Sequence, residues 1–308
     1  MEFLPYKSSD QSSILSLFRE SFGKEMTKKF WEWRFLNNPL NQLLIHLAWD
    51  GDTLAAHYAV SPVLINFDNA NYLTGLSMTT MTHPKYRGMK LFPQLAEQIY
   101  NKMKELDYLM VWGFPNNNSH RTFIKDLYWK DIYEIPTMRL NLSENQEGGI
   151  NNISMDDGFE LNYNDKPFSL YLFQVKKDKR YLRWRYAENP INRYSNIVIK
   201  DHQDVLSFCV IKKYLNSLDI VDFQARNQHD GAELLDQTVA YARNNRLEFI
   251  NCWAPRHHFF HQLCEKAGFI NAEPITYLCF RQLSENDGMK VSDNYTDWYI
   301  QMGDSDVY

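Results

Sequence analysis

Apolar positions along the chain alternate between helical and strand spacing. Residues 91–103 carry a large apolar side chain at every fourth position, which predicts an amphipathic helix. The short runs YLMVWGF (residues 108–114) and LEFINCW (residues 247–253) are typical of buried strands. A polar turn at Gly51 joins two longer apolar runs and predicts a hairpin. The pattern as a whole predicts a mixed α/β fold.

One segment occurs twice. FWEWRFLNNPLNQ begins at Phe30, YLRWRYAENPINR begins at Tyr181, and both contain Trp-Arg-aromatic-x-x-Asn-Pro. After each copy the expected elements follow in the same order: hairpin, strand, helix, strand, helix and strand. A match of this length, separated by about half the chain, predicts a duplicated domain. Aromatic residues at helical spacing before Asn-Pro usually pack in a core and end a helix, although Arg34 is a candidate for binding an anionic substrate group.

We therefore expect two tandem domains, each a mixed and largely antiparallel sheet flanked by helices. The polar stretch before Gly158, which contains paired glycines, predicts a linker. A second polar stretch begins near Ser284 and predicts a tail. The expected boundaries are 1–143 for the first domain, 144–157 for the linker, 158–283 for the second domain and 284–308 for the acidic tail.

The composition is that of an ordinary globular protein. Of 308 residues, 44% are hydrophobic and 23% are charged, and the formal net charge is -5. A negative chain has no overall field that attracts nucleic acid or an anionic membrane. No signal peptide or membrane-spanning run is visible, and the four cysteines follow neither zinc-ligand nor disulfide spacing. We expect a cytoplasmic protein with reduced thiols and no bound metal; the sequence leaves its oligomeric state open.

The stretch THPKYRGMKLF (residues 82–92) places an Arg-Gly pair between a predicted strand and a predicted helix. A helix N-terminus presents N–H groups without partners and a partial positive charge, and both stabilise a bound phosphate. Gly88 allows the backbone to adopt a positive φ or to approach an anion closely. Lys90 adds a positive charge nearby. This junction is therefore suited to a diphosphate.

This junction and the sequence NNNSHRTFIKDLYW from Asn116 resemble motifs of the GNAT superfamily of acyl-CoA-dependent acyltransferases. The ending EKAGF from Glu265 resembles the second motif again, and the duplicated layout is similar to that of tandem-domain members. The resemblance implies a GNAT fold, with acetyl-CoA or another acyl-CoA as cofactor. It places the cofactor on the first half, at Met81, Thr82, Arg87, Gly88, Met89, Lys90, Leu91, Phe92, Asn116, Ser119 and Phe123.

Two departures from the superfamily pattern concern this cofactor site. Lys90 and Phe92 stand where the superfamily usually has glycine or another small residue; Lys90 could contact the pyrophosphate, and Phe92 could point into the core. In the second half, FQARNQHDGAELL has no Arg-Gly step and carries Asp230 and Glu233 where a phosphate would approach. Like charges repel, so we expect the second domain to lack a cofactor.

Acyl transfer from a thioester to an amine needs a polarised carbonyl, a deprotonated amine and close placement of both. By the resemblance, a backbone N–H of the strand near Thr80 polarises the carbonyl. His57 is the first candidate for the base, because imidazole titrates near neutral pH. A structural, hydrogen-bonded role for His57 is the alternative, and a base acting through water is equally admissible. Tyr58 joins Arg34 as a candidate for substrate binding.

The remaining candidates lie on the helix after the next strand and in the tail. Many members of the superfamily use a tyrosine on that helix as the acid for the leaving thiolate, but the matching position holds Phe123. In the tail, the apolar triplet at Trp298 could dock near the domain cleft and let Asp304 or Asp306 attract a cationic amine. A solvated acidic end is the alternative.

The sequence thus predicts an acyl-CoA-dependent N-acyltransferase, with acetyl-CoA as the first candidate donor. The expected acceptor is a small amine, with an amino sugar or a nucleotide-linked amino sugar as examples. Two alternatives stay open: an aminoacyl transferase of tandem GNAT fold that uses aminoacyl-tRNA, and a non-catalytic module that binds acyl-CoA or another metabolite.

Overall fold

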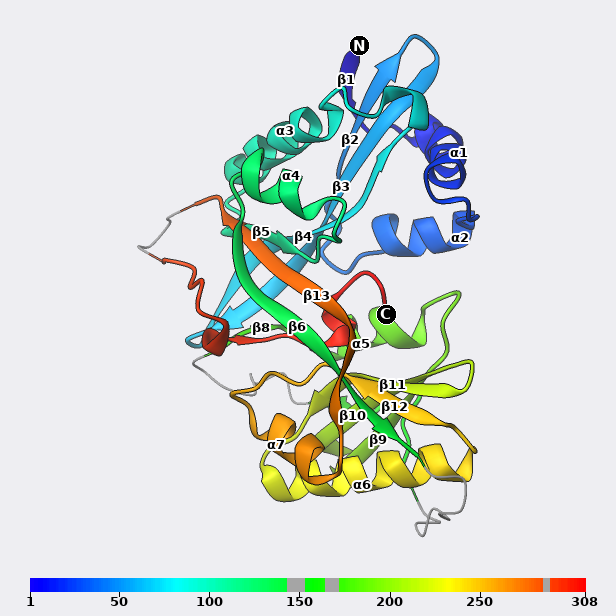
Figure 1. The fold of residues 1–308 in the computed structure, drawn as a ribbon, viewed down its shortest axis with the longest axis vertical. Coiled ribbons are helices and arrows are strands. Elements are labelled where there is room, and N and C mark those ends of the chain that lie inside the picture. The colour runs from blue at the N-terminus through cyan, green and yellow to red at the C-terminus, as the bar shows by residue number, and fades with distance from the viewer. Residues whose placement is uncertain (143–152, 164–171, 285–288) are drawn as a thin grey trace. The chain divides into compact units, whose positions relative to one another are not determined.

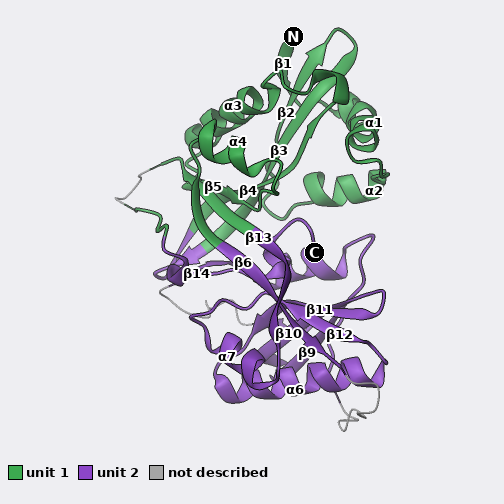
Figure 2. Ribbon diagram, in the orientation of Figure 1, with its two compact units in different colours: residues 1–65, 72–133, 277–293 green, residues 66–71, 134–276, 294–308 purple. Residues whose placement is uncertain are grey.

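The computed structural model describes residues 1–142, 153–163, 172–284 and 289–308. The chain forms two compact units (Figure 2). Most of the expected linker, residues 144–157, lies outside the described residues. Unit 1 consists of Met1–Ile65, Tyr72–Tyr133 and Tyr277–Asp293, and unit 2 consists of Asn66–Asn71, Glu134–Thr276 and Asn294–Tyr308. The units therefore interleave along the chain, whereas the expected boundaries divide it at single points.

Unit 1 is a mixed sheet with helices on both faces. Its elements are β1 (Glu2–Pro5), η1 (Ser8–Asp10), α1 (Gln11–Phe22), α2 (Lys28–Trp31), η2 (Glu32–Leu36), β2 (Leu44–Asp50), β3 (Thr53–Phe67), β4 (Ala70–Thr82), η3 (Pro84–Tyr86), α3 (Leu91–Glu105), β5 (Met110–Gly113) and α4 (His120–Lys125). Two further strands, β6 (Lys130–Asn141) and β13 (Ile270–Gln282), run from one unit into the other.

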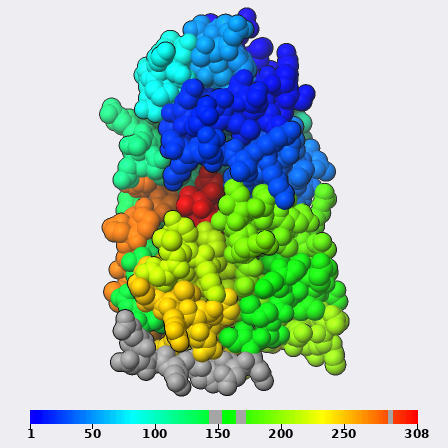
Figure 3. All heavy atoms as spheres, turned by 90° about the vertical axis from the view of Figure 1, so that its right-hand side faces the viewer, coloured from blue at the N-terminus to red at the C-terminus, as the bar shows by residue number. Residues whose placement is uncertain are grey.

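The strand order in unit 1 is β1-β2-β3-β4-β5-β13. β2 is antiparallel to both β1 and β3, β4 and β5 are parallel, and β13 is antiparallel to β5. Helices α1 and α2 lie on one face of this sheet, and α3 and α4 lie on the other (Figure 1). In Figure 3 the N-terminal helices, in blue, form the outer surface of unit 1 on their side.

The periodic apolar residues account for the position of α3. Leu91, Leu95, Ile99 and Met103 are all buried in one cluster with side chains from the sheet, as the helical spacing predicts. The predicted hairpin around Gly51 is also present, because β2 and β3 pair on either side of that turn. These local predictions are confirmed.

Unit 2 follows a similar plan. Its elements are β7 (Asn162–Tyr163), β8 (Phe173–Val175), α5 (Lys179–Leu182), η4 (Arg183–Ala187), β9 (Tyr194–Asp201), β10 (Asp204–Tyr214), β11 (Ser217–Gln224), α6 (Gln228–Asn244), β12 (Phe249–Cys252), α7 (Phe259–Lys266), η6 (Tyr295–Asp297), β14 (Trp298–Tyr299) and η7 (Met302–Asp304). β10 is antiparallel to β9 and β11, and β11 is parallel to β12. The two repeated Trp-Arg segments have the same local structure, since η2 and η4 are both single π-helical turns.

Each half of the chain supplies the last strand of the other unit's sheet. In unit 1, Cys279–Gln282 of β13 pairs with Met110–Gly113 of β5, although β13 belongs to the second half of the sequence. In unit 2, Met138–Asn141 of β6 pairs with Phe249–Cys252 of β12. Because an unpaired strand edge leaves its N–H and C=O groups without partners, neither sheet is complete without the other half of the chain.

This exchange predicts that the expected first domain, residues 1–143, does not fold alone. The fragment would lose β13, exposing the edge of β5 and the core positions that Leu278 and Phe280 fill. We expect it to aggregate or to unfold without a cooperative transition, measured by circular dichroism on heating. The matched control is the full chain at the same concentration. A fragment with a cooperative transition near that of the full chain would contradict the prediction.

Candidate functional site

The loop between β4 and α3 carries the predicted phosphate-binding residues on the surface of unit 1. His83 caps the short turn η3 by accepting the Lys85 N–H at 3.1 Å through Nδ1. Gly88 has φ = 82°, and a Cβ built on it would have no atom within 4 Å, so the position needs glycine for its conformation and not for space. Lys90, the N-cap of α3, is also left-handed, with φ = 55°.

The N-terminus of α3 has no cap of its own. No side chain accepts its first N–H groups, and its first turn contains no acidic residue. These groups and the helix dipole are therefore available to an anion. A hollow of about 220 Å³ lies beside them. It is lined by Thr82, Tyr86, Arg87, Gly88, Lys90, Leu91, Phe92, Pro93, Thr122 and Asp126.

The corresponding helix of unit 2, α6, is capped from within. The Asn227 side chain accepts the Asp230 N–H at 2.9 Å. The Asp230 carboxylate in turn accepts hydrogen bonds from Ser207 Oγ at 2.6 Å and Arg226 Nε at 2.8 Å. Burial raises the pKa of Asp230, but the hydrogen bonds from Arg226 and Ser207 outweigh it and lower the pKa below the usual value. A negative charge already occupies this helix end, which opposes an added phosphate.

Strands β4 and β5 pair only briefly. Their parallel register includes Gly75 with Val111 and Leu76 with Trp112, after which β5 ends at Gly113 while β4 continues to Thr82. Thr79 has φ = 49°, an unusual conformation for a β-branched residue. The backbone at Thr80, Met81 and Thr82 therefore lies beyond the last rung shared with β5. β4 thus extends past its neighbour β5 in the region where the resemblance implies a splayed strand.

His57 holds this irregular part of β4 in place. Its Nδ1 lies 2.9 Å from the Thr79 carbonyl oxygen, so Nδ1 carries the proton and donates it. The ring is fully buried and packs against Phe35, and Nε2 has no hydrogen-bond partner. Burial lowers the pKa of His57 to about 4. The side chain is therefore neutral at physiological pH.

Arg34 and Tyr58, the candidates for substrate binding, are both buried. Arg34 Nε donates to Met78 Sδ at 3.4 Å, and the guanidinium also contacts the Trp33 ring. Tyr58 OH donates to Ser77 Oγ at 2.9 Å and lies 3.1 Å from Tyr100 OH, while burial raises its pKa. Both side chains therefore belong to the interior of unit 1.

The two aromatic residues of the predicted cofactor site also turn inward. The Phe92 ring packs against the rings of Tyr58 and Phe123, with centroids 5.1 and 5.0 Å away. It thus fills space beneath α3 instead of obstructing the loop. At the start of α4, Asn116 Oδ1 accepts the Ser119 N–H at 3.1 Å, so these two residues shape the entry to the helix.

Asp304 is buried in unit 2, at 3% exposure. Its carboxylate forms an ion pair with Lys177 Nζ at 2.9 Å, and Lys177 also pairs with Asp222. Burial raises the pKa of Asp304 to about 6, with Lys177 opposing and Asp222 reinforcing the change. The carboxylate is therefore paired with a buried lysine. The tail hypothesis required it to face an open surface, and it does not.

The rest of the tail covers a free edge of β11. Pairing of β11 with β12 includes Ser217–Ile220, and beyond it the Phe223 N–H donates to Gln301 Oε1 at 3.0 Å, while Tyr299 OH donates to the Phe223 carbonyl at 2.6 Å. Arg185 Nε donates to the Gly303 carbonyl at 3.1 Å. The strand edge that β4 leaves open in unit 1 is thus occupied by the chain itself in unit 2.

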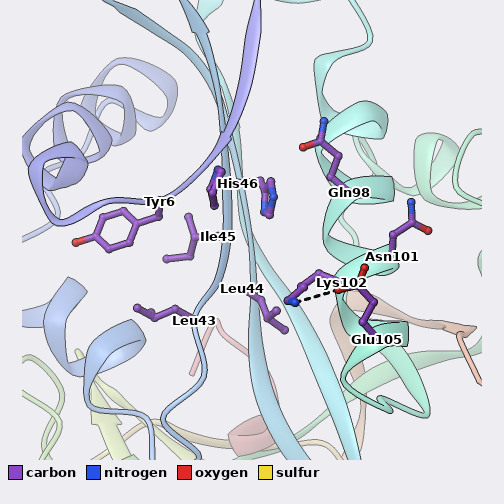
Figure 4. Close-up of a pocket in the computed structure, with 10 residues that line it drawn as sticks. Tyr6, Leu43, Leu44, Ile45, His46, Gln98, Asn101, Lys102 and Glu105 are labelled. Carbon is purple, nitrogen blue, oxygen red and sulfur yellow. Dashed lines mark hydrogen bonds and ion pairs between the residues drawn. The ribbon is translucent and has the colours of Figure 1, made fainter.

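A larger cavity, about 480 Å³, lies elsewhere in unit 1 (Figure 4). Its polar side chains Gln98, Asn101, Lys102 and Glu105 come from the C-terminal half of α3. Gln98 and Lys102 extend toward β2, where the Nδ1 of His46 has no hydrogen-bond partner. This end of the helix carries the negative end of the dipole, and Glu105 adds a negative charge. The cavity is therefore unsuited to phosphate, and the smaller hollow at the start of α3 is the better candidate site.

The chain is similar to several known proteins. Residues 2–129 match the family model of the Acetyltransferase (GNAT) domain, and no curated protein sequence matches the chain. Three similar solved structures each cover 92% of this chain. One is a probable N-acyltransferase of unknown function from Enterococcus faecalis, with a TM-score of 0.66, 9% sequence identity and 72% of its own chain covered. The second is a GCN5-related N-acetyltransferase from Anabaena variabilis, with a TM-score of 0.64, 9% identity and 73% of its chain covered. The third is a GCN5-related N-acetyltransferase from Kribbella flavida, with a TM-score of 0.64, 10% identity and 72% of its chain covered.

Identities this low establish the fold alone, and the match to the GNAT family model is limited to residues 2–129. The predicted mixed α/β fold and the resemblance to GNAT proteins are confirmed. No helix within the described ranges is long and apolar enough to cross a bilayer.

The buried imidazole predicts a specific loss of stability in acid. The pKa of His57 is about 4 in the folded protein and about 6.5 in an unfolded chain, so between these values only the unfolded chain binds the proton. The contribution of neutral His57 to the free energy of unfolding is fully present above about pH 6.5, and it is lost as the pH falls toward about 4. Going from about pH 7 to about pH 5 should destabilise the unmodified protein by about 2 kcal/mol more than the His57→Gln variant in urea unfolding.

The matched control for this comparison is His202→Gln, because the His202 side chain is 96% exposed. It should keep the full acid sensitivity. Other buried histidines, such as His258, titrate in both proteins and cancel in the difference. Equal acid sensitivity in His57→Gln and the unmodified protein would show that His57 is not held neutral.

The docked tail predicts that removing residues after Asn294 destabilises unit 2. The deletion exposes the cavity filled by Trp298 and leaves Arg185 without its carbonyl partners. We expect the free energy of unfolding to fall by at least about 3 kcal/mol in urea titrations. Val307→Ala, at an exposed position, is the control and should change it little. An unchanged transition in the shortened chain would show that the tail contributes nothing to the fold.

Proposed function

We propose that the chain transfers an acetyl group from acetyl-CoA to the nitrogen of a small amine, because residues 2–129 match the Acetyltransferase (GNAT) domain. Use of an acyl-CoA and an acceptor follows from the match of residues 2–129 to the GNAT domain. The acetyl group and the amine, with amino sugars as the first class to test, are our proposal. The observation that supports it is the uncapped N-terminus of α3 beside Gly88 and Lys90.

In this proposal the diphosphate of the cofactor binds the first N–H groups of α3. Arg87 and Lys90 are exposed on either side of Gly88 and supply positive charge. Each favourable charge contact at a helix N-terminus contributes about 1 kcal/mol. Phe92 does not interfere, because its ring packs beneath the helix. The capped N-terminus of α6 offers no equivalent, so we propose one cofactor per chain.

Polarisation of the thioester carbonyl is assigned to the backbone N–H at Thr80. It follows the left-handed Thr79 on the part of β4 that extends past β5. A fixed N–H stabilises the oxyanion that forms when the amine attacks, and it requires no reorganisation during the reaction. His57 contributes as a positioning residue, because its Nδ1–H holds the Thr79 carbonyl.

Proton transfer is assigned to water. His57 has a pKa of about 4 and is fully buried, so it is poorly matched to accept a proton from an amine that is cationic near neutral pH. Phe123 cannot donate a proton to the departing sulfur. A thiol has a pKa of about 8.5, so it can leave as the thiolate and be protonated in solution.

The two alternative functions make different predictions in the same assay. An aminoacyl transferase would release free tRNA and would not depend on Gly88. A non-catalytic module would bind acetyl-CoA without releasing CoA thiol in the presence of any amine; Phe123 and the buried His57 are the features that favour it. Incubation with acetyl-CoA and a panel of amines, followed by thiol detection, separates transfer from binding alone.

The proposal predicts that acetyl-CoA binds with a stoichiometry of one and that Gly88→Glu abolishes binding. The carboxylate would stand at the diphosphate site, and a left-handed non-glycine residue costs about 1 kcal/mol. Calorimetry with the full chain measures both effects. Gly23→Glu is the matched control, because Gly23 has φ = 66° and equally open surroundings at the end of α1.

Two outcomes would count against this proposal. Two sites per chain would show that unit 2 also binds the cofactor despite its capped helix. Normal binding to Gly88→Glu, with Gly23→Glu behaving alike, would place the diphosphate elsewhere.

A further inference from the structure

Three side chains from separate parts of the sequence meet at the start of α4 in unit 1. His120 is the first residue of α4, Asp131 lies on β6 and Cys279 lies on β13. His120 Nε2 is 2.6 Å from Asp131 Oδ1, and Cys279 Sγ is 3.0 Å from the same oxygen. The three donor atoms all lie within 4.8 Å of one another.

These three atoms are a nitrogen, an oxygen and a sulfur of the types that bind zinc. Zinc prefers a tetrahedral arrangement of imidazole, carboxylate and thiolate ligands, with bonds of about 2.0 to 2.3 Å. Ligand atoms around such an ion are separated by roughly 3.3 to 3.7 Å. The two printed separations, 2.6 and 3.0 Å, lie just below this range, and all three atoms lie within 4.8 Å of one another, so small side-chain movements would bring them to bonding distance. Asp131 is 54% exposed, which leaves a solvent-facing fourth position for water.

The surroundings hold two of the three ligands in orientation. The His120 ring stacks on Tyr277, with centroids 4.1 Å apart and ring planes 15° apart. Cys279 is fully buried and is fixed by the pairing of β13 with β5 at Gly113. Such support from neighbouring groups is what orients metal ligands in known sites. The exposed Asp131 side chain is the ligand that can change its position to suit the ion.

We propose that His120, Asp131 and Cys279 bind one Zn²⁺ ion. Binding replaces the thiol proton: Zn²⁺ and Cys279 S–H give a zinc–thiolate bond and release one proton to solvent, with no oxidation or reduction. The ion ties the start of α4 to β6 and β13. Thr122 of the same helix and Asp126 at its C-cap line the hollow beside the phosphate loop, so the ion stabilises one wall of that hollow.

This role is structural and does not depend on the proposed acyl transfer. Among the described residues it also uses the one cysteine that lies in unit 1. Cys252 and Cys264 in unit 2 approach each other to 3.8 Å, so they form the competing thiol site that an experiment must separate.

The test is titration of the chelator-treated, reduced full chain with Co²⁺, a spectroscopic substitute for zinc. We expect saturation at one ion per chain, visible bands of tetrahedral Co²⁺ and a thiolate-to-metal charge-transfer band in the near ultraviolet. Added Zn²⁺ should displace Co²⁺ without releasing a proton, and Zn²⁺ added to the metal-free chain should release one proton per ion. At about a hundred times its Kd, Zn²⁺ should raise the Tm by about 5 °C or more.

Variants locate the ion. Cys279→Ser should remove the charge-transfer band, and His120→Gln should weaken Zn²⁺ binding at least about tenfold. Cys264→Ser and His202→Gln are the matched controls and should leave the Co²⁺ spectrum unchanged. Where Cys279→Ser fails to fold, Asp131→Asn at its exposed position supplies the same test through the loss of Zn²⁺ affinity. No charge-transfer band in the unmodified chain, or a band lost in Cys264→Ser and kept in Cys279→Ser, would overturn the proposal.

Discussion

The short parallel pairing between β4 and β5 is the constraint on which the candidate site depends. Once β5 ends at Gly113, the last residues of β4 have no partner strand on that side, while β3 still borders β4 on the other. The left-handed Thr79 places the bend within β4, and the buried hydrogen bond from His57 stabilises it. A buried imidazole with one nitrogen satisfied is a costly feature, which suggests that the position of this strand matters more than maximal stability.

The two units differ at the start of the helix that follows the central strands and at the neighbouring strand edge. In unit 1 the N-terminus of α3 has no side-chain cap, and the end of β4 extends past its neighbour β5. In unit 2 the Asp230 carboxylate neutralises the start of α6, and residues of the C-terminal segment bond to the free edge at Phe223. This difference between the two units is the basis for proposing one cofactor per chain.

Exchange of the last strands makes the units interdependent. The strand β13 completes the sheet that carries the candidate site, and it also brings Cys279 next to residues of the first half. A separate first domain would have neither the edge strand nor this cluster. The expected boundary near residue 143 follows composition, but a polar linker does not reveal which sheet the strands on its two sides join.

The sequence by itself determined the helix from Leu91, the hairpin at Gly51, the repeated segments and the loop at Gly88, because these depend on local periodicity and backbone preference. The fold class and the superfamily resemblance came from the order of such elements. Tertiary structure alone decided the burial of Asp304 against Lys177 and the inward turn of Phe92. It also decided the strand exchange and the cluster at His120, since these arise from contacts between residues far apart in the chain, which no local pattern encodes.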